Sequence, residues 1–195
     1  MAMPSFSTPF YELTDETIEV RGHILYRIRA LKDINEDVHA GDLGGFVEST
    51  ENLDASHGAW VFDDAWVSGS ACVYDSARVS DRAWVYGDAN VFGDACVCGN
   101  ACVFGDARVF NRAHVFGYAH VFNRAHVFNR ACVYDSARVF NRACVYDSAR
   151  VSGKAKVGGD ARVEGHAEVC GSATIHGTDH IGGTARVDGN TEGEK

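Results

Sequence analysis

The stretch AWVFDDAWVSGSACVYDS, residues 59–76, begins a pattern that continues to Val187 without a residue gained or lost. Ala stands at every sixth position from Ala59 to Ala185, with one exception at Asp179, and Val or Ile follows two residues after each of these 22 positions. Alternate residues of an extended strand point to the same side, so each Ala and Val pair predicts one buried face. A helix would drift out of phase with a six-residue period. The repeat therefore predicts short strands.

The residue two positions after each Val or Ile predicts a corner. It is Gly, Asn or Asp in every copy, from Asp63 to Gly189, and these residue types best tolerate a left-handed backbone. We therefore expect left-handed φ at all of these corners. The unit resembles the hexapeptide repeat of the left-handed parallel β-helix family, in which three hexapeptides make one coil. The resemblance implies an all-β, left-handed parallel β-helix of about seven coils, with Ala and Val inside.

The N-terminal part of the chain does not follow the repeat. Residues 10–31 indicate two strands around a turn at Arg21 to His23, and Val47 and Leu53 anticipate the six-residue spacing. A β-helix has open strand edges at its ends, and the hairpin would cover the first of them. Four regions are predicted, in chain order: an N-terminal β-hairpin cap at 1–42, an irregular first coil at 43–58, the hexapeptide β-helix at 59–189 and a polar tail at 190–195.

Composition limits the class of protein. The net charge is −9, with 11 acids against 4 bases in residues 1–58 and 16 against 14 in residues 59–195. The sequence has no apolar run long enough to span a membrane, and the N-terminus lacks the basic and apolar segments of a secretory signal. Seven Cys is an odd number without an extracellular context, which indicates reduced thiols. We expect a cytoplasmic protein.

A family resemblance rests on three segments: YRIRALKDI at 26–34, GDLGGFVES at 41–49 and GAWVFDDA at 58–65. Together they resemble the N-terminal signature of phage and prophage hexapeptide-repeat proteins. They are also similar to the YdcK-like bacterial proteins, which are often described as acyltransferases. With the repeats, the resemblance extends over nearly the whole chain, and it implies a location in the cytoplasm of a bacterial host cell. It bears on fold and lineage more than on activity, because fold does not determine function.

Residues 18 apart should stack on neighbouring coils, and this predicts two aromatic columns. The first contains Tyr74, Phe92, Phe110, Phe128 and Tyr146, and the second contains Tyr86, Phe104, Phe122 and Phe140. Stacked rings on adjacent strands stabilise a sheet, which is the structural interpretation. A long apolar surface also marks interfaces, so the columns are candidates for self-association into a dimer or trimer, or for a partner.

Four arginines follow Asn corners in the middle of the chain and form a predicted basic belt: Arg112, Arg124, Arg130 and Arg142. One interpretation is pairing between coils, of Asp94 with Arg112, Asp106 with Arg124 and Arg142 with Asp160, which stabilises little at an exposed edge. The other is an anionic target. A net charge of −9 argues against general nucleic-acid binding.

Three histidines, His114, His120 and His126, hold the same position in successive hexapeptides. That spacing puts them on three different faces of one coil, where they cannot share a metal. Each has stacked cysteine neighbours, Cys96 and Cys132 in the case of His114, but flat columns rarely provide four converging ligands. We therefore predict no metal and no cofactor.

The leading functional hypothesis is a non-catalytic, phage-type β-helical binding or scaffold protein that binds and blocks a host factor, such as a defence component. The basic belt and the aromatic columns are its candidate surface. The alternative is an acetyl-coenzyme-A-type hexapeptide acyltransferase, whose site would lie between subunits, with His114, His120 or His126 as general base. By the resemblance such enzymes carry loops that interrupt the coils, and this sequence has none between Ala59 and Val187.

Overall fold

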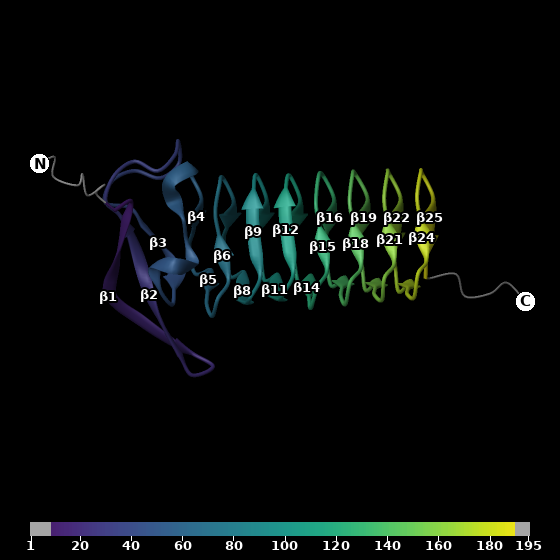
Figure 1. The fold of residues 1–195 in the computed structure, drawn as a ribbon, viewed down its shortest axis with the longest axis horizontal. Coiled ribbons are helices and arrows are strands. Elements are labelled where there is room, and N and C mark those ends of the chain that lie inside the picture. Colours follow the sequence, from purple (N-terminus) through teal and green to yellow (C-terminus); the bar gives the residue numbers. More distant parts are fainter. Residues whose placement is uncertain (1–8, 190–195) are drawn as a thin grey trace, which may run out of the picture.

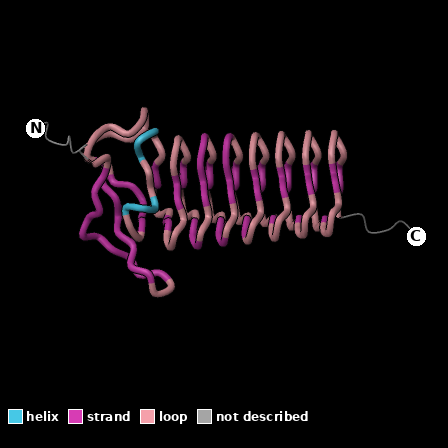
Figure 2. The backbone as a smooth tube through the Cα atoms, viewed as in Figure 1, coloured by secondary structure: helices cyan, strands magenta, loops and turns pink. Residues whose placement is uncertain are grey.

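The computed structural model describes residues 9–189, which form a row of stacked coils with a β-hairpin at the N-terminal end (Figure 1). The fold class is as predicted, all-β with parallel strands in a β-helix. In the described residues the helical structure is limited to two short 3-10 turns, η1 (Thr50–Asn52) and η2 (Ala55–His57), both beside the hairpin (Figure 2). The polar tail predicted at 190–195 lies outside the described residues, as do the first eight residues of the chain.

Three parallel sheets form the three sides of the stacked coils, here called the prism. Each coil contributes one strand to each side, except that the first coil gives the third side only an isolated bridge from Leu53 to Val73. The first face contains β3 (Leu43–Val47), β5 (Trp66–Val67), β8 (Trp84–Gly87), β11 (Cys102–Gly105), β14 (His120–Phe122), β17 (Arg138–Val139), β20 (Lys156–Val157) and β23 (Thr174–Ile175). The second face contains β4 (Trp60–Val61), β7 (Arg78–Val79), β10 (Cys96–Val97), β13 (His114–Val115), β16 (Cys132–Val133), β19 (Arg150–Val151), β22 (Glu168–Cys170) and β25 (Arg186–Asp188). The third face contains β6 (Cys72–Val73), β9 (Asn90–Gly93), β12 (Arg108–Asn111), β15 (His126–Val127), β18 (Cys144–Val145), β21 (Arg162–Val163) and β24 (His180–Ile181).

Strand register confirms the 18-residue coil. Val103, for example, pairs with Val85 on one side and Val121 on the other. The predicted interior is also confirmed, because every repeat Ala from Ala59 to Ala167 and every repeat Val from Val61 to Val169 has no exposed surface. The core is a narrow apolar column that neighbouring coils close together.

The corners have the predicted left-handed backbone from Asp63 to Gly183, with φ of 53° at Asp63 and 74° at Gly87. Gly189 is the exception. Its backbone turns back onto the preceding coil, where its N–H donates to the Cys170 carbonyl at 3.3 Å and its carbonyl accepts from the Ser172 hydroxyl at 3.0 Å. Among the described corners, the left-handed backbone is lost at Gly189 alone.

An irregular coil precedes the repeats and raises the total to about eight turns, whereas the repeats alone predicted about seven. Val47 pairs with Val67, and Leu53 bridges to Val73, so both predicted core residues lie in the interior stack. The buried Asn52 side chain donates to the carbonyls of Gly69 and Ala71, each at 2.9 Å. Its amide thereby satisfies the backbone where strand pairing is missing.

The hairpin extends the first face. β1 (Tyr11–Val20) pairs antiparallel with β2 (His23–Ala30), and β2 pairs antiparallel with β3. Leu25 is fully buried against Phe46 and Trp66. The Tyr11 hydroxyl donates to the Leu53 carbonyl at 2.9 Å. The hairpin thus provides both hydrogen bonds and apolar contacts to the first coil.

Candidate interaction surface

The two predicted aromatic columns stack as expected. On the third face, the ring centroids of Tyr74, Phe92, Phe110 and Phe128 follow one another at 4.9 Å, and Tyr146 follows at 5.0 Å. On the first face, Tyr86, Phe104 and Phe122 stack at 4.9 Å, and Phe140 follows at 5.4 Å. All of these side chains are half-buried because each ring covers the next. The columns stabilise adjacent coils and present mainly ring edges to solvent.

A third, shorter column lies on the second face and was not predicted from the sequence. Phe116 stacks on Tyr134 at 5.0 Å and is 37% exposed, while Tyr118 at the adjoining corner is 63% exposed. Among the large apolar side chains of the repeats, Phe116 and Tyr118 are the exposed ones in the described structure. The sequence held a signal for this site, since Tyr118 is the one aromatic residue at the second corner position.

The basic belt divides between two edges of the prism. Arg112 and Arg130 lie where the third face turns into the second, here called the Arg112 edge. Arg124 and Arg142 lie where the first face turns into the third, here called the Arg124 edge. The belt is therefore two separate edges, each with two stacked arginines.

The three predicted pairs between coils are present. Arg112 lies 3.5 Å from Asp94, Arg124 lies 3.3 Å from Asp106, and Arg142 lies 2.6 Å from Asp160. These side chains are well exposed, so each pair stabilises the fold little. Arg130 differs from the others, because within the described residues no carboxylate oxygen lies within 4.0 Å of its guanidinium. Asp147 lines the same hollow as Arg130 without pairing with it, so the Arg112 edge carries one guanidinium that is not engaged in an ion pair.

Each edge also carries a hollow along the corner residues. The hollow on the Arg112 edge has a volume of about 520 Å³ and that on the Arg124 edge about 420 Å³. Their floors are held by stacked amides, in which Asn111 donates to Asn129 at 3.0 Å and Asn123 donates to Asn141 at 3.1 Å. The four arginines of the basic belt line the same two hollows, two in each.

The three histidines lie on three faces, as the spacing predicted. His114 is exposed on β13, while the half-buried His120 and His126 meet Phe104 and Phe110 edge-on, at 6.5 and 6.4 Å. Burial lowers the pKa of both half-buried imidazoles, with a further contribution from a nearby arginine in each case. Both rings are therefore neutral at pH 7. Within residues 9–189 no three His, Cys, Asp or Glu side chains are grouped so as to hold a metal ion.

A polar chain on the third face was not expected from the sequence. The Tyr146 hydroxyl donates to one oxygen of Glu164, and the other oxygen of Glu164 lies 2.7 Å from Nε2 of His180. A carboxylate that orients an imidazole is a common arrangement in proton transfer. His180 is 56% exposed, so the group stands on open sheet surface.

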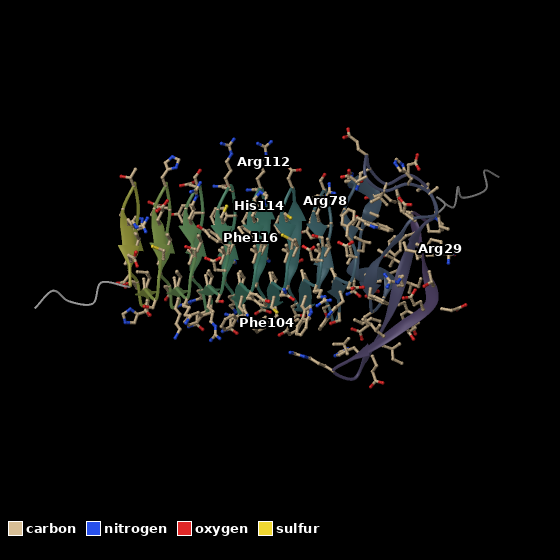
Figure 3. All side chains as sticks on the ribbon, turned by 180° about the vertical axis from the view of Figure 1, so that it is seen from behind. Arg29, Arg78, Phe104, Arg112, His114 and Phe116 are labelled. Atoms are coloured by element: carbon tan, nitrogen blue, oxygen red, sulfur yellow. The ribbon has the colours of Figure 1, made fainter. Side chains whose placement is uncertain are left out.

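One coil brings the features of the second face together. Arg112, His114 and Phe116 follow one another from the edge across the face (Figure 3). Arg130 and Tyr134 stack beside them on the next coil, and Tyr118 closes the row at the far corner. We call this set the second-face patch: Arg112, Arg130, His114, Phe116, Tyr118 and Tyr134.

No protein-family model and no curated protein sequence matches the chain. In residues 9–189 no helix has the length and apolar character needed to cross a membrane.

Proposed function

We propose that the protein is a non-catalytic β-helical binding or scaffold protein, and that its partner docks on the second-face patch. One observation carries the proposal: the exposed aromatic rings of Phe116 and Tyr118 share a face with Arg130, whose guanidinium forms no ion pair within the described residues. Exposed aromatics beside an arginine that is free to pair suit a protein surface with apolar and acidic groups. The rigid, uninterrupted coils would hold such a surface in one shape.

The resemblance to phage and prophage hexapeptide-repeat proteins supports a narrower version of this proposal. In it the partner is a host protein of the bacterial cytoplasm, such as a defence component, which binding would block. The half-buried columns on the first and third faces are the proposed surface for self-association into a dimer or trimer, because their ring edges form long stripes.

The test uses two matched variants. The first variant, Arg112→Glu with Arg130→Glu, reverses the charge of both arginines on the Arg112 edge. The second variant, Arg124→Glu with Arg142→Glu, makes the same change of charge on the Arg124 edge. We expect the wild type and the second variant to capture the same host proteins. The first variant and Tyr118→Ser should each reduce the captured amount roughly tenfold or more. Equal loss from both charge variants, or no loss from Tyr118→Ser, would contradict the patch.

The acyltransferase alternative has a separate outcome. The proposed function expects no acyl transfer from acetyl coenzyme A to amine or hydroxyl acceptors. Turnover that disappears in His180→Ala, in which the carboxylate-paired imidazole is removed, would replace binding with catalysis on the third face. Turnover that disappears only in His114→Ala, His120→Ala or His126→Ala would instead assign catalysis to the histidine that the sequence proposed as general base.

A further inference from the structure

Two thiols project side by side from the second face. Cys96 and Cys98 are two residues apart, and the residues next to Cys96 in the chain, Ala95 and Val97, are fully buried. Because alternate residues of a strand share a side, both sulfur atoms point outward. Both cysteines are free and half-buried. The repeat puts two cysteines in one hexapeptide here and in no other copy.

The neighbouring coils surround Cys96 with groups that favour a thiolate. Strand register pairs Cys96 with Arg78 on one side and with His114 on the other. The neighbouring Cys98 thiol is the main reason that the pKa of Cys96 falls to about 6, with His114 and Arg78 adding to it and burial opposing it. Cys96 in turn raises the pKa of Cys98, as do burial and, to a smaller extent, Asp81.

Two other cysteines provide an internal comparison. Cys132 pairs with His114 and Cys144 pairs with His126, so each has an imidazole in register, as Cys96 does. Neither has a second thiol two residues away, and burial raises the pKa of each above its ordinary value of 9.0. The feature that distinguishes Cys96 is therefore the adjacent Cys98.

We propose that Cys96 and Cys98 form a redox-active dithiol site that reacts with hydroperoxides, in which Cys96 is the attacking thiolate and Cys98 the resolving thiol. This site borders the second-face patch at His114, but the proposal does not rest on the binding function. The site would add a chemical activity to a protein that is otherwise proposed to be non-catalytic. The hexapeptide pattern does not require two cysteines in one copy.

The reaction balances in two steps. The Cys96 thiolate attacks one oxygen of the hydroperoxide; an S–O bond forms, the O–O bond breaks, and the leaving alkoxide or hydroxide takes a proton from water. Cys96 is then a sulfenic acid, oxidised by two electrons, and the peroxide is reduced to an alcohol or water. Next the Cys98 sulfur attacks the Cys96 sulfur, an S–S bond forms, and the hydroxyl leaves as water with the Cys98 proton.

Strand geometry makes this disulfide reversible. Two residues along a strand span roughly 6.6 Å between Cα atoms, near the upper end of the range that disulfides accept, about 4.4–6.8 Å. A bond formed at that limit is strained, and strained disulfides are readily reduced by thiols. The pair therefore suits a switch better than a structural crosslink.

The first experiment uses the wild-type chain with limiting iodoacetamide at pH 6 and measures modification of each cysteine by peptide mass spectrometry. At that pH about half of Cys96 is thiolate, against less than roughly one part in a thousand for Cys132 and Cys144. A thiolate of low pKa is also a weaker nucleophile, and this reduces the advantage of Cys96 in reaction rate by about twentyfold. Cys96 should still react at least tenfold faster, and equal rates at Cys96 and Cys132 would overturn the proposal.

The second experiment adds hydrogen peroxide and two variants. In the wild type, disulfide formation should lower the mass of the peptide that contains Cys96 and Cys98 by two hydrogens. Dithiothreitol should restore the original mass. Cys98→Ser should instead give a Cys96 sulfenic acid that dimedone traps, with the pH midpoint of its alkylation moved upward from about 6. Cys132→Ser is the control and should behave as wild type. Oxidation of Cys132 or Cys144 before Cys96, or an unchanged midpoint in Cys98→Ser, would contradict the site.

Discussion

A residue in this fold interacts most closely with the residues 18 positions before and after it. The interior stacks Val on Val and Ala on Ala, the outer positions stack rings on rings, and the corners stack amides and charges on their counterparts. Each side chain must therefore pack against the residues at the same repeat position on the coil before and the coil after it. Close backbone approach between neighbouring coils makes this requirement most severe where a glycine lies inside the first coil.

Gly45 provides the sharpest test at the residue scale. A Cβ atom there would lie 2.4 Å from the Ala65 carbonyl oxygen and 2.8 Å from Cγ1 of Val61. The nearer obstacle is backbone of the next coil, which cannot rotate away. Gly45→Ala should reduce the free energy of unfolding by about 1–3 kcal/mol, measured by urea denaturation.

Gly182→Ala is the matched control for Gly45→Ala. Its added Cβ would meet side-chain atoms of Glu164 and His180 at 3.4 to 3.5 Å, which is ordinary contact. The change should stay within about 0.5 kcal/mol of wild type. If Gly45→Ala unfolds at the same urea concentration as Gly182→Ala, the first coil is looser than its packing indicates.

Position in the repeat explains why so many contacts could be predicted at this scale. Asp94 with Arg112, Asp106 with Arg124, and Arg142 with Asp160 follow from the 18-residue period, as do the two long aromatic columns. Exposure could not be predicted in the same way. Phe116 and Phe104 hold the same repeat position, yet Phe116 is exposed at 37%, because ring coverage depends on which residues stand on the coils above and below.

At the scale of elements, the hairpin and the coil meet through polar contacts that no period encodes. The sequence indicated two strands before the repeats, but pairing of β2 with β3 depends on an irregular segment, Leu31 to Asp42, that returns the chain to the first face. Glu48, just after β3, connects three parts of the molecule. Its carboxylate accepts from the Gly69 N–H at 2.6 Å and lies 2.8 Å from Nδ1 of His23 in the hairpin.

Glu48 should make this junction sensitive to acid. Its hydrogen bond with His23, followed by that from the Gly69 N–H, lowers the pKa of the carboxyl, and burial opposes the change only in part. A depressed folded-state pKa contributes stability that is complete above the unfolded value of about 4.3 and is lost as the pH falls through the folded value. Acid should therefore loosen the hairpin from the first coil.

The measurement compares wild type with Glu48→Gln, which keeps the side-chain shape and removes the charge. At pH 7 the variant should melt at a lower temperature and exchange its β2 amide protons faster. The difference between the two proteins should shrink as the pH falls below about 4.3. A difference that stays constant down to pH 3 would mean that the Glu48 charge does not stabilise the junction.

At the scale of the whole molecule, the two ends of the prism are unlike. The hairpin covers the first coil, whereas β23, β24 and β25 form the last strand of their sheets in the described structure. The core is opening at this end, since Ala185 is exposed and Ile181 and Val187 are only half-buried. Strand edges and apolar residues at one end could stack on another prism, which is the usual hazard of an open sheet edge.

Asp179 stands at this open end, in the single inward position where the repeat lacks Ala. Its carboxylate accepts from the His176 N–H at 3.2 Å and lies 3.4 Å from the His176 ring, and its side chain is 52% exposed. A second prism stacked on this end would bury that carboxylate, at a cost of several kcal/mol. An inward-pointing charge on a terminal strand is a known protection against edge-to-edge association. We therefore predict that the one break in the Ala column opposes end-to-end association.

Asp179→Ala should convert the end of the prism into a surface that continues the repeat. We expect an increase in mass with concentration, measured by sedimentation velocity across a dilution series and compared with wild type at each concentration. Asp160→Ala is the control, because it removes the same unit of charge from an outer corner, where the side chain pairs with Arg142 and faces away from the core. Association in Asp179→Ala alone assigns protection to the inward carboxylate. Equal association in both variants would assign it to net charge, and no association in either would show that the open end does not stack even when its column is complete.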